Sequence, residues 1–159
     1  MSSTLIIVGS ARGDGNTVDA ARQLSDQTGG KLLDLLEYSI APYDYAHDYP
    51  AQDNFLALAR RIVTYDRVIL ASPVYWYSMS GGMKDFLDRF TDLLTFHKDL
   101  GRRLRGLEMA VLSCSGEERA NDGFYEPFRL SAEYLGMSYG PEYHGWVRGK
   151  RILLRQCTD

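Results

Sequence analysis

The stretch TLIIVGSARGDGNT, residues 4–17, decides how the chain folds. Its first part, residues 4–9, is short, apolar and rich in β-branched side chains, which is typical of a strand buried on both faces. Its second part concentrates glycine, hydroxyl, arginine and asparagine residues directly before a helical pattern. We therefore predict a strand, a polar loop and a helix that Asn16 or Thr17 caps and that continues to about Thr28.

The rest of the chain alternates strand patterns with helix patterns. Further strands are predicted over residues 31–36, 67–72, 107–114 and 138–147, and further helices over 53–63, 80–94 and 121–135. The tail, residues 150–156, is either a short strand or a helix. Because the inner strands are uniformly apolar and alternate with helices, we predict an α/β fold with a doubly wound parallel sheet. Residues 1–159 suit one domain.

The bulk composition is that of an ordinary globular protein. The 159 residues are 45% hydrophobic and 25% charged, with a net charge of −3, so neither nucleic acid nor a membrane is expected as a partner. The start of the chain has no signal-peptide pattern. Cys114 and Cys157 are the only cysteines, and three scattered histidines add no ligand set, so we expect a cytoplasmic protein without a metal.

Three unusual loops are expected to meet at one edge of the predicted sheet. They follow the first, third and fourth strands and are SARGDGNT (10–17), SPVYWYSMSGG (72–82) and SCSGEERANDG (113–123). In a doubly wound sheet, ligands bind outside the carboxyl ends of the strands. The sequence therefore predicts a binding site that these three loops share.

The first loop has the composition of a phosphate site. Unpaired backbone N–H groups at a helix N-terminus attract an anion, and the helix dipole adds to that attraction. Gly15 lets the backbone approach a ligand closely, and Arg12 can neutralise part of a phosphate dianion. Ser10, Asn16 and Thr17 can donate further hydrogen bonds. A plain strand-to-helix turn is the alternative, and the absence of G-K-[ST] excludes a Walker A loop.

The second loop places three aromatic residues in a row. Tyr75, Trp76 and Tyr77 lie between a proline and a serine-glycine helix start. Such a rim at the binding edge suits a planar heteroaromatic ring, whose polar edge exposed backbone N–H groups can meet. The alternative is that these aromatic side chains fill the core or a subunit interface.

The first two loops resemble motifs of the flavodoxin-fold NAD(P)H-dependent FMN reductases and related oxidoreductases. GSARGDGNT resembles the family's GSxRxxGNT phosphate loop, and SPVYWYSMSGGMKDFLDR resembles its flavin loop and the helix that follows. The resemblance covers most of the chain in element order. It implies a flavodoxin-like sheet of five parallel strands in the order 2-1-3-4-5 with helices on both faces, FMN as the cofactor, and NADPH or NADH as the co-substrate.

The resemblance also implies which residues bind FMN. Those at the phosphate are Ser10, Arg12, Gly15, Asn16 and Thr17. Those along the isoalloxazine are Pro73, Val74, Tyr75, Trp76, Tyr77 and Ser78, with Ser113, Ser115 and Gly116 on the other side of the ring. Some relatives bind an iron–sulfur cluster through cysteines after the second strand, and the loop here has none. We expect the aromatic residues of this loop to cap the flavin, to line a subunit interface or to lie in solvent. These residues are Tyr43, Tyr45, His47 and Tyr49.

The implied activity is that of an oxidoreductase whose chemistry belongs to the flavin. Hydride would pass from the nicotinamide to FMN N5 and then to a small acceptor, such as a quinone, a nitro or azo compound or a flavin, with no side chain acting as acid or base. The alternatives are a flavodoxin-like one-electron carrier and a non-catalytic interaction protein. The choice between NADH and NADPH stays open, and a homodimer or homotetramer is expected.

Four further side chains and one basic cluster are assigned ordinary roles. Cys114 is interpreted as a small buried hydrophobe, with a redox thiol as the alternative. Lys84 and Arg89 are expected in solvent, or paired with Asp85 or Asp88. Glu117 is expected to face water or to cap the helix that follows. The cluster formed by Arg102, Arg103 and Arg105 is interpreted as a solvated strand entry.

Overall fold

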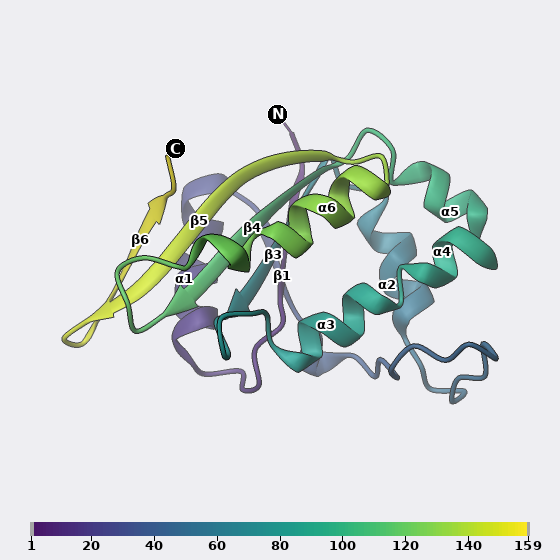
Figure 1. Cartoon of the computed structure of the whole chain (residues 1–159), viewed down its shortest axis with the longest axis horizontal. Helices are drawn as coiled ribbons and strands as arrows, with labels where there is room; N and C mark the ends of the chain where they lie inside the picture. The colour runs from purple at the N-terminus through teal and green to yellow at the C-terminus, as the bar shows by residue number, and fades with distance from the viewer. Residues whose placement is uncertain (1, 159) are drawn as a thin grey trace.

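The computed structural model describes residues 2–158 and contains a six-stranded sheet in the order β2-β1-β3-β4-β5-β6, drawn in Figure 1. The strands are β1 (Thr4–Val8), β2 (Lys31–Asp34), β3 (Arg67–Pro73), β4 (Glu108–Ser115), β5 (Ser138–Arg148) and β6 (Arg151–Gln156). The helices are α1 (Asn16–Thr28), α2 (Phe55–Ile62), α3 (Gly81–Asp88), α4 (Thr91–Thr95), α5 (Lys98–Arg103) and α6 (Glu126–Tyr134). Two short 3-10 turns are η1 (Leu35–Glu37) and η2 (Asp122–Phe124).

The sheet is mixed, which corrects the prediction of five strands that are all parallel. β1 to β5 are parallel in the predicted order, and β6 pairs antiparallel with β5. The tail forms a strand because the chain reverses after β5, at Gly149, whose φ of 66° suits glycine. Ile152 and Leu154 of β6 then pack against the buried layer beneath α1. The α/β, flavodoxin-like class of the fold is confirmed.

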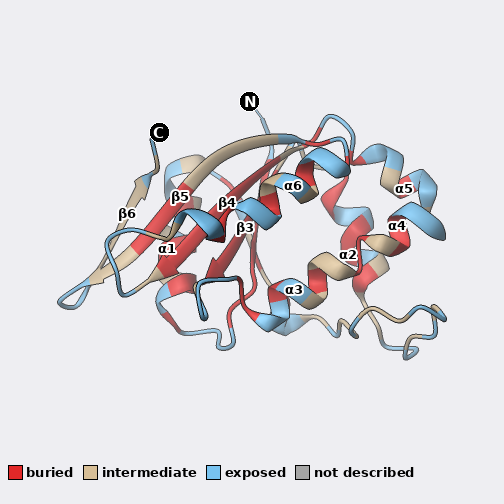
Figure 2. Ribbon diagram, in the orientation of Figure 1, coloured by how far each residue is buried: buried red, intermediate tan, exposed pale blue. Residues whose placement is uncertain are grey.

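The inner strands bury both faces, because alternate side chains point to opposite sides of a strand. In β1, Ile6 and Val8 join an apolar cluster with residues of α1, whereas Leu5 and Ile7 join a larger cluster with residues of α2, α3 and α6. In Figure 1, α1 lies behind the sheet, and α3 and α6 lie in front of it. Figure 2 shows the central strands as buried and β6 as only partly buried. Helices therefore cover both faces, as predicted.

The helices after β3 are shorter than the sequence predicted. The expected helix over residues 80–94 is divided into α3 and α4 at Arg89 and Phe90. Residues 98–103, including Arg102 and Arg103 of the basic cluster, form α5 rather than an entry into β4. The expected helix over residues 121–135 consists of η2 followed by α6.

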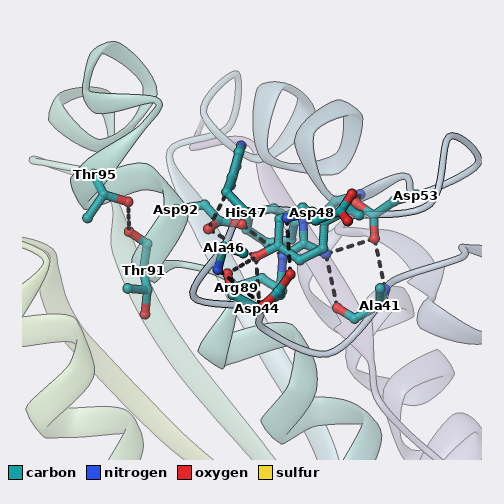
Figure 3. Close-up of polar contacts among 12 residues, drawn as sticks. Ala41, Asp44, Ala46, His47, Asp48, Asp53, Arg89, Thr91, Asp92 and Thr95 are labelled. Atoms are coloured by element: carbon teal, nitrogen blue, oxygen red, sulfur yellow. Dashed lines mark hydrogen bonds and ion pairs between the residues drawn. The ribbon is translucent and has the colours of Figure 1, made fainter.

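Arg89 is buried at the junction of α3 and α4, so the prediction that it lies in solvent or pairs with Asp85 or Asp88 is wrong. Its side chain donates from Nε to Asp92 at 2.9 Å and from both terminal nitrogens to Asp53, at 2.7 and 3.0 Å. It also donates to the carbonyl oxygen of Ala41 at 3.0 Å, as Figure 3 shows. Asp53 is remote in sequence, so no local spacing could indicate this pair. Lys84, in contrast, pairs with Asp88 at the surface.

The buried Arg89 holds the long segment between β2 and α2. The Tyr49 ring lies 3.5 Å from the guanidinium carbon, and its hydroxyl donates to Asp92 at 3.1 Å. His47 lies 3.3 Å from the same carboxylate and stacks on Phe96. His47 and Tyr49 are therefore half-buried against side chains of residues 89–96, a role that the alternatives for this segment did not include, whereas Tyr45 lies in solvent.

The buried ion pairs of Arg89 with Asp53 and Asp92 predict a contribution to stability that is lost in acid. Burial alone would raise the pKa of Asp53, but hydrogen bonds from Arg89, Ala41 and Phe55, together with the charge of Arg89, lower it overall. A carboxylate whose folded pKa is below its unfolded value stabilises the fold above the unfolded pKa, and this contribution is lost as the pH falls. Asp53→Asn should therefore cost about 3–5 kcal/mol at pH 7. It should also flatten the fall in the free energy of unfolding below about pH 5.

Urea unfolding between neutral and acidic pH checks this prediction. The matched control is Asp88→Asn, which removes an exposed carboxylate and should keep the wild-type slope. Equal slopes for wild type and Asp53→Asn would contradict the assignment.

Candidate functional site

The first two loops lie side by side because of a close contact between Gly9 and the start of α3. Val8 and Ala71 are neighbours in the sheet, and Gly9 N–H donates to the Ala71 carbonyl at 2.8 Å. The Ser80 hydroxyl donates to the Gly9 carbonyl and accepts from Met83 N–H, which caps α3. A Cβ at residue 9 would lie 2.8 Å from the Met83 side chain. Glycine at this position therefore lets α3 begin directly beside the first loop.

The first loop ends in an open helix N-terminus. The N-cap of α1 is Gly15 rather than Asn16 or Thr17, and no side chain accepts a hydrogen bond there. The first N–H groups of a helix have no partner within the helix. Here those of Asn16, Thr17 and Val18 therefore lack a side-chain cap. Such an end attracts an anion.

A cleft of about 240 Å³ opens where residues of the three loops meet. The three loops follow the carboxyl ends of β1, β3 and β4 (Figure 1). The Arg12 side chain lies over Gly15, where a Cβ would come within 3.0 Å of its Nε. The cleft is lined by residues of all three loops: Ser10, Arg12, Gly15, Asn16, Thr17, Pro73, Val74, Tyr75, Cys114, Ser115 and Gly116. The structure thus brings together most of the residues predicted for the site.

Cys114 lines this cleft although sequence reasoning did not include it in the site. The residue is 3% exposed, and burial raises the pKa of its thiol despite an opposing hydrogen bond from Thr17. It is therefore a small buried group, as expected, whose edge borders the cleft. The sequence signal that Cys114 would border the cleft was its position at the end of β4, on the face of the strand that packs under α1.

The second loop is a tight turn that displays its aromatic side chains. Tyr75 and Ser78 exchange backbone hydrogen bonds of 2.8 and 3.1 Å. The two residues between them, Trp76 and Tyr77, have φ of 49° and 67°. Positive φ at both central positions defines a type I′ turn, in which asparagine and glycine are preferred. Two large aromatic residues there are strained, and their side chains are 93% and 69% exposed.

A second hollow, of about 450 Å³, adjoins the cleft. Val74 and Ser115 line both spaces, so the two are adjacent. The hollow is otherwise lined by Trp76, Tyr77, Glu117, Arg119, Ala120 and Asn121. The Asn121 side chain donates to the Tyr77 carbonyl at 3.4 Å, which links the second and third loops across it.

Two predicted site residues lie elsewhere. Ser113 has no exposed surface, and its hydroxyl is bonded to Tyr125 and His144 at 2.5 and 2.7 Å, so the side chain does not face the cleft. Ser78 lines neither space and closes the turn through its backbone. The Ser113–His144 pair is sealed from solvent, so no substrate can reach it as a nucleophile. Sequence reasoning missed Tyr125 and His144, which form no recognisable motif.

Within residues 2–158, no group of three or more His, Cys, Asp or Glu side chains is arranged to hold a metal ion. In the same part of the chain, no helix has both the length and the apolar character needed to cross a membrane.

Comparison with known proteins yields matches over nearly the whole chain. The NADPH-dependent FMN reductase family matches residues 3–149. YwqN of Bacillus subtilis (strain 168), an inferred NAD(P)H-dependent FMN-containing oxidoreductase, is 27% identical over 152 residues, which is 91% of this chain and 83% of that protein.

Solved structures show the same fold. The Trp repressor binding protein from Bacillus subtilis has a TM-score of 0.72 at 23% identity, over 92% of this chain and 88% of that one. An NADPH-quinone reductase from P. pentosaceus has a TM-score of 0.63 at 22% identity, over 88% and 82% of the two chains.

The strained turn predicts that a stabilising substitution exists in the site. Changing Trp76→Asn together with Tyr77→Gly provides the residues that a type I′ turn prefers. Because positive φ costs a non-glycine residue about 1–3 kcal/mol, the double variant should gain about 1–2 kcal/mol in the free energy of unfolding, measured with urea. The control Tyr45→Asn removes an exposed aromatic residue from ordinary backbone and should be nearly neutral. A loss of stability in the double variant would contradict the strain.

Proposed function

The chain belongs to the NADPH-dependent FMN reductase family and is an FMN-dependent oxidoreductase that uses NAD(P)H, and we propose how its residues hold the cofactor and which reaction they serve. The domain formed by residues 1–159 would transfer electrons from NAD(P)H through FMN to a small acceptor. The observation that carries this proposal is the cleft between the open N-terminus of α1 and the exposed aromatic turn.

The first loop fits the phosphate of FMN. The uncapped N–H groups at the start of α1 provide donors, and the absence of a side chain at Gly15 leaves room for the Arg12 side chain beside them. Arg12 would supply the positive charge, and the hydroxyls of Ser10 and Thr17 border the same cleft. A dianionic ester is the group that this donor set satisfies best.

The second and third loops fit the flavin ring. Pro73, Val74 and Tyr75 line one side of the cleft, and Ser115 and Gly116 line the other. A planar ring between these two loops would present one face to the adjoining hollow, beside Trp76 and Tyr77. The N–H groups of Val74 and Tyr75 are already bonded, at 2.9 and 2.8 Å, so other backbone N–H groups of these loops would meet the polar edge of the ring and stabilise negative charge there.

Bound FMN would supply the redox chemistry, taking hydride at N5 from NAD(P)H and passing it on to a small acceptor such as a quinone, a nitro or azo compound or a flavin. The protein's own contribution is binding and orientation. Arg119 is the cation that lines the adjoining hollow and would attract the phosphates of the nicotinamide nucleotide. No side chain is required as a catalytic acid or base.

A one-electron carrier of the flavodoxin type is the rival function. The net charge of −3 is modest for a carrier that binds protein partners through charge. Mixing FMN-loaded protein with NADPH or NADH without oxygen separates the two functions. A reductase should lose its yellow colour rapidly and regain it when a quinone is added. Slow bleaching with both nucleotides would favour the carrier, and a protein that stays colourless after FMN addition would contradict both.

We also propose self-association as a homodimer or homotetramer. Leu94, Leu130 and Tyr134 are 39%, 50% and 80% exposed and border one hollow between α4 and α6. Exposed apolar residues that gather in this way are typical of an interface. The cytoplasmic location stays a prediction.

The phosphate assignment predicts a specific loss of cofactor affinity. Arg12→Ala combined with Asn16→Ala removes two groups that would bond to a charged phosphate, so FMN binding should weaken by about 2–4 kcal/mol. Because both residues are exposed, the free energy of unfolding of the protein without FMN should change little.

Quenching of FMN fluorescence measures the affinity. The matched control is Arg22→Ala, which removes an exposed positive charge further along α1 and should leave FMN binding unchanged. An unaltered affinity in the double variant would rule out the phosphate site.

A further inference from the structure

One corner of the sheet is polar where its centre is apolar. Ser113 of β4 lies opposite His144 of β5, and His144 lies opposite Arg155 of β6, so the three form a row across the strands. Neither Ser113 nor His144 has any exposed surface. Buried polar groups are hydrogen-bonded in folded proteins, so the partners of this row show what it does.

The hydrogen bonds of this row run in one direction. His144 Nε2 lies 2.8 Å from the carbonyl oxygen of Glu117, which can only accept, so Nε2 bears the proton. Burial, and then the charge of Arg155, lower the pKa of His144 against the raising effect of the Glu117 bond. The neutral ring leaves Nδ1 to accept from the Ser113 hydroxyl, which in turn accepts from Tyr125. The chain of bonds therefore ends on the third loop.

The row holds the tip of the third loop, residues 117–121, through two consecutive carbonyl oxygens. His144 donates to that of Glu117, and the Arg155 guanidinium donates to that of Glu118 at 2.8 Å. Trp146 orients both donors, because its ring is parallel to His144 within 7° and lies 5.3 Å from the guanidinium carbon. Strand β6, which the sequence left undecided, thus supplies half of the support.

The loop tip separates two hollows. One is the 450 Å³ hollow beside Trp76, and the other, of about 600 Å³, lies beside Arg155 and Cys157. Arg119 lines both of them. Its side chain is exposed and can adopt several rotamers, so the guanidinium can reach either hollow, and the position of the loop backbone sets how far it extends into each.

We propose that His144 and Arg155 are positioning residues that hold the loop tip so that Arg119 faces the hollow beside Trp76 and binds the phosphates of the nicotinamide nucleotide. The inference rests on the proposed function for the identity of that ligand. The support lies outside the cleft that would hold FMN. Its loss should therefore weaken nucleotide binding and leave the affinity for FMN unchanged.

Two substitutions of one residue test the contact. In His144→Gln the side-chain amide can still reach the Glu117 carbonyl, whereas in His144→Asn the shorter amide can reach only Ser113. Deuterium exchange over residues 117–121, measured without FMN, reports whether the loop is held. Rapid mixing of FMN-loaded protein with NADPH gives the dissociation constant of the nucleotide and the limiting rate of flavin reduction.

We expect faster exchange and a dissociation constant for NADPH raised about fivefold or more in His144→Asn, with the limiting rate and FMN affinity of wild type. His144→Gln should resemble wild type in all four measurements. Equal exchange in wild type and His144→Asn would overturn the proposal, and so would faster exchange with unchanged NADPH binding or equal impairment of both variants. If wild type fails to bind FMN, the proposed function fails, and the exchange comparison still decides whether His144 holds the loop.

Discussion

The position of the cleft depends on the contact between Gly9 and the start of α3. β1 and β3 are neighbours in the sheet, so their loops leave it together, but neighbouring strands alone do not fix loop conformation. The Ser80 hydroxyl does so by bonding to the Gly9 carbonyl while it caps α3. Met83 then packs where a side chain at residue 9 would lie. The open end of α1 and the aromatic turn are thereby held on opposite sides of one space.

The parts of the site that sequence could predict are those with local causes. The polar loop before α1 and the aromatic loop after β3 are continuous motifs, and strand patterns indicated that they would meet. Contacts between segments that are distant in the sequence could not be predicted from it. The buried pairing of Arg89 with Asp53 joins segments with no shared pattern, and the alternation of β4 turns Ser113 away from the cleft toward His144. β6 was undecided because its residues suit a strand or a helix until β5 provides an edge.

Strain and support are distributed differently over the three loops. The first loop is open and its donors are free, so it is suited to bind. The turn at Trp76 and Tyr77 has a costly backbone that exposes its rings, which is expected where function rather than stability selects the residues. Residues 116–121 of the third loop form no helix or strand, and His144 of β5 and Arg155 of β6 bond to two of their carbonyl oxygens. The binding edge is therefore a set of shaped loops on a rigid sheet.

The central claim is that the N-terminus of α1 binds the phosphate of FMN, and an amide-resolved NMR titration tests it most directly. With FMN added to the isotope-labelled protein, the account predicts that the amide signals of Asn16, Thr17 and Val18 move most, and that the signals of residues 74, 75, 115 and 116 move with them. Inorganic phosphate should move the first group alone. If FMN shifts signals near Cys157 or along α6 and leaves residues 10–18 unmoved, the claim is contradicted.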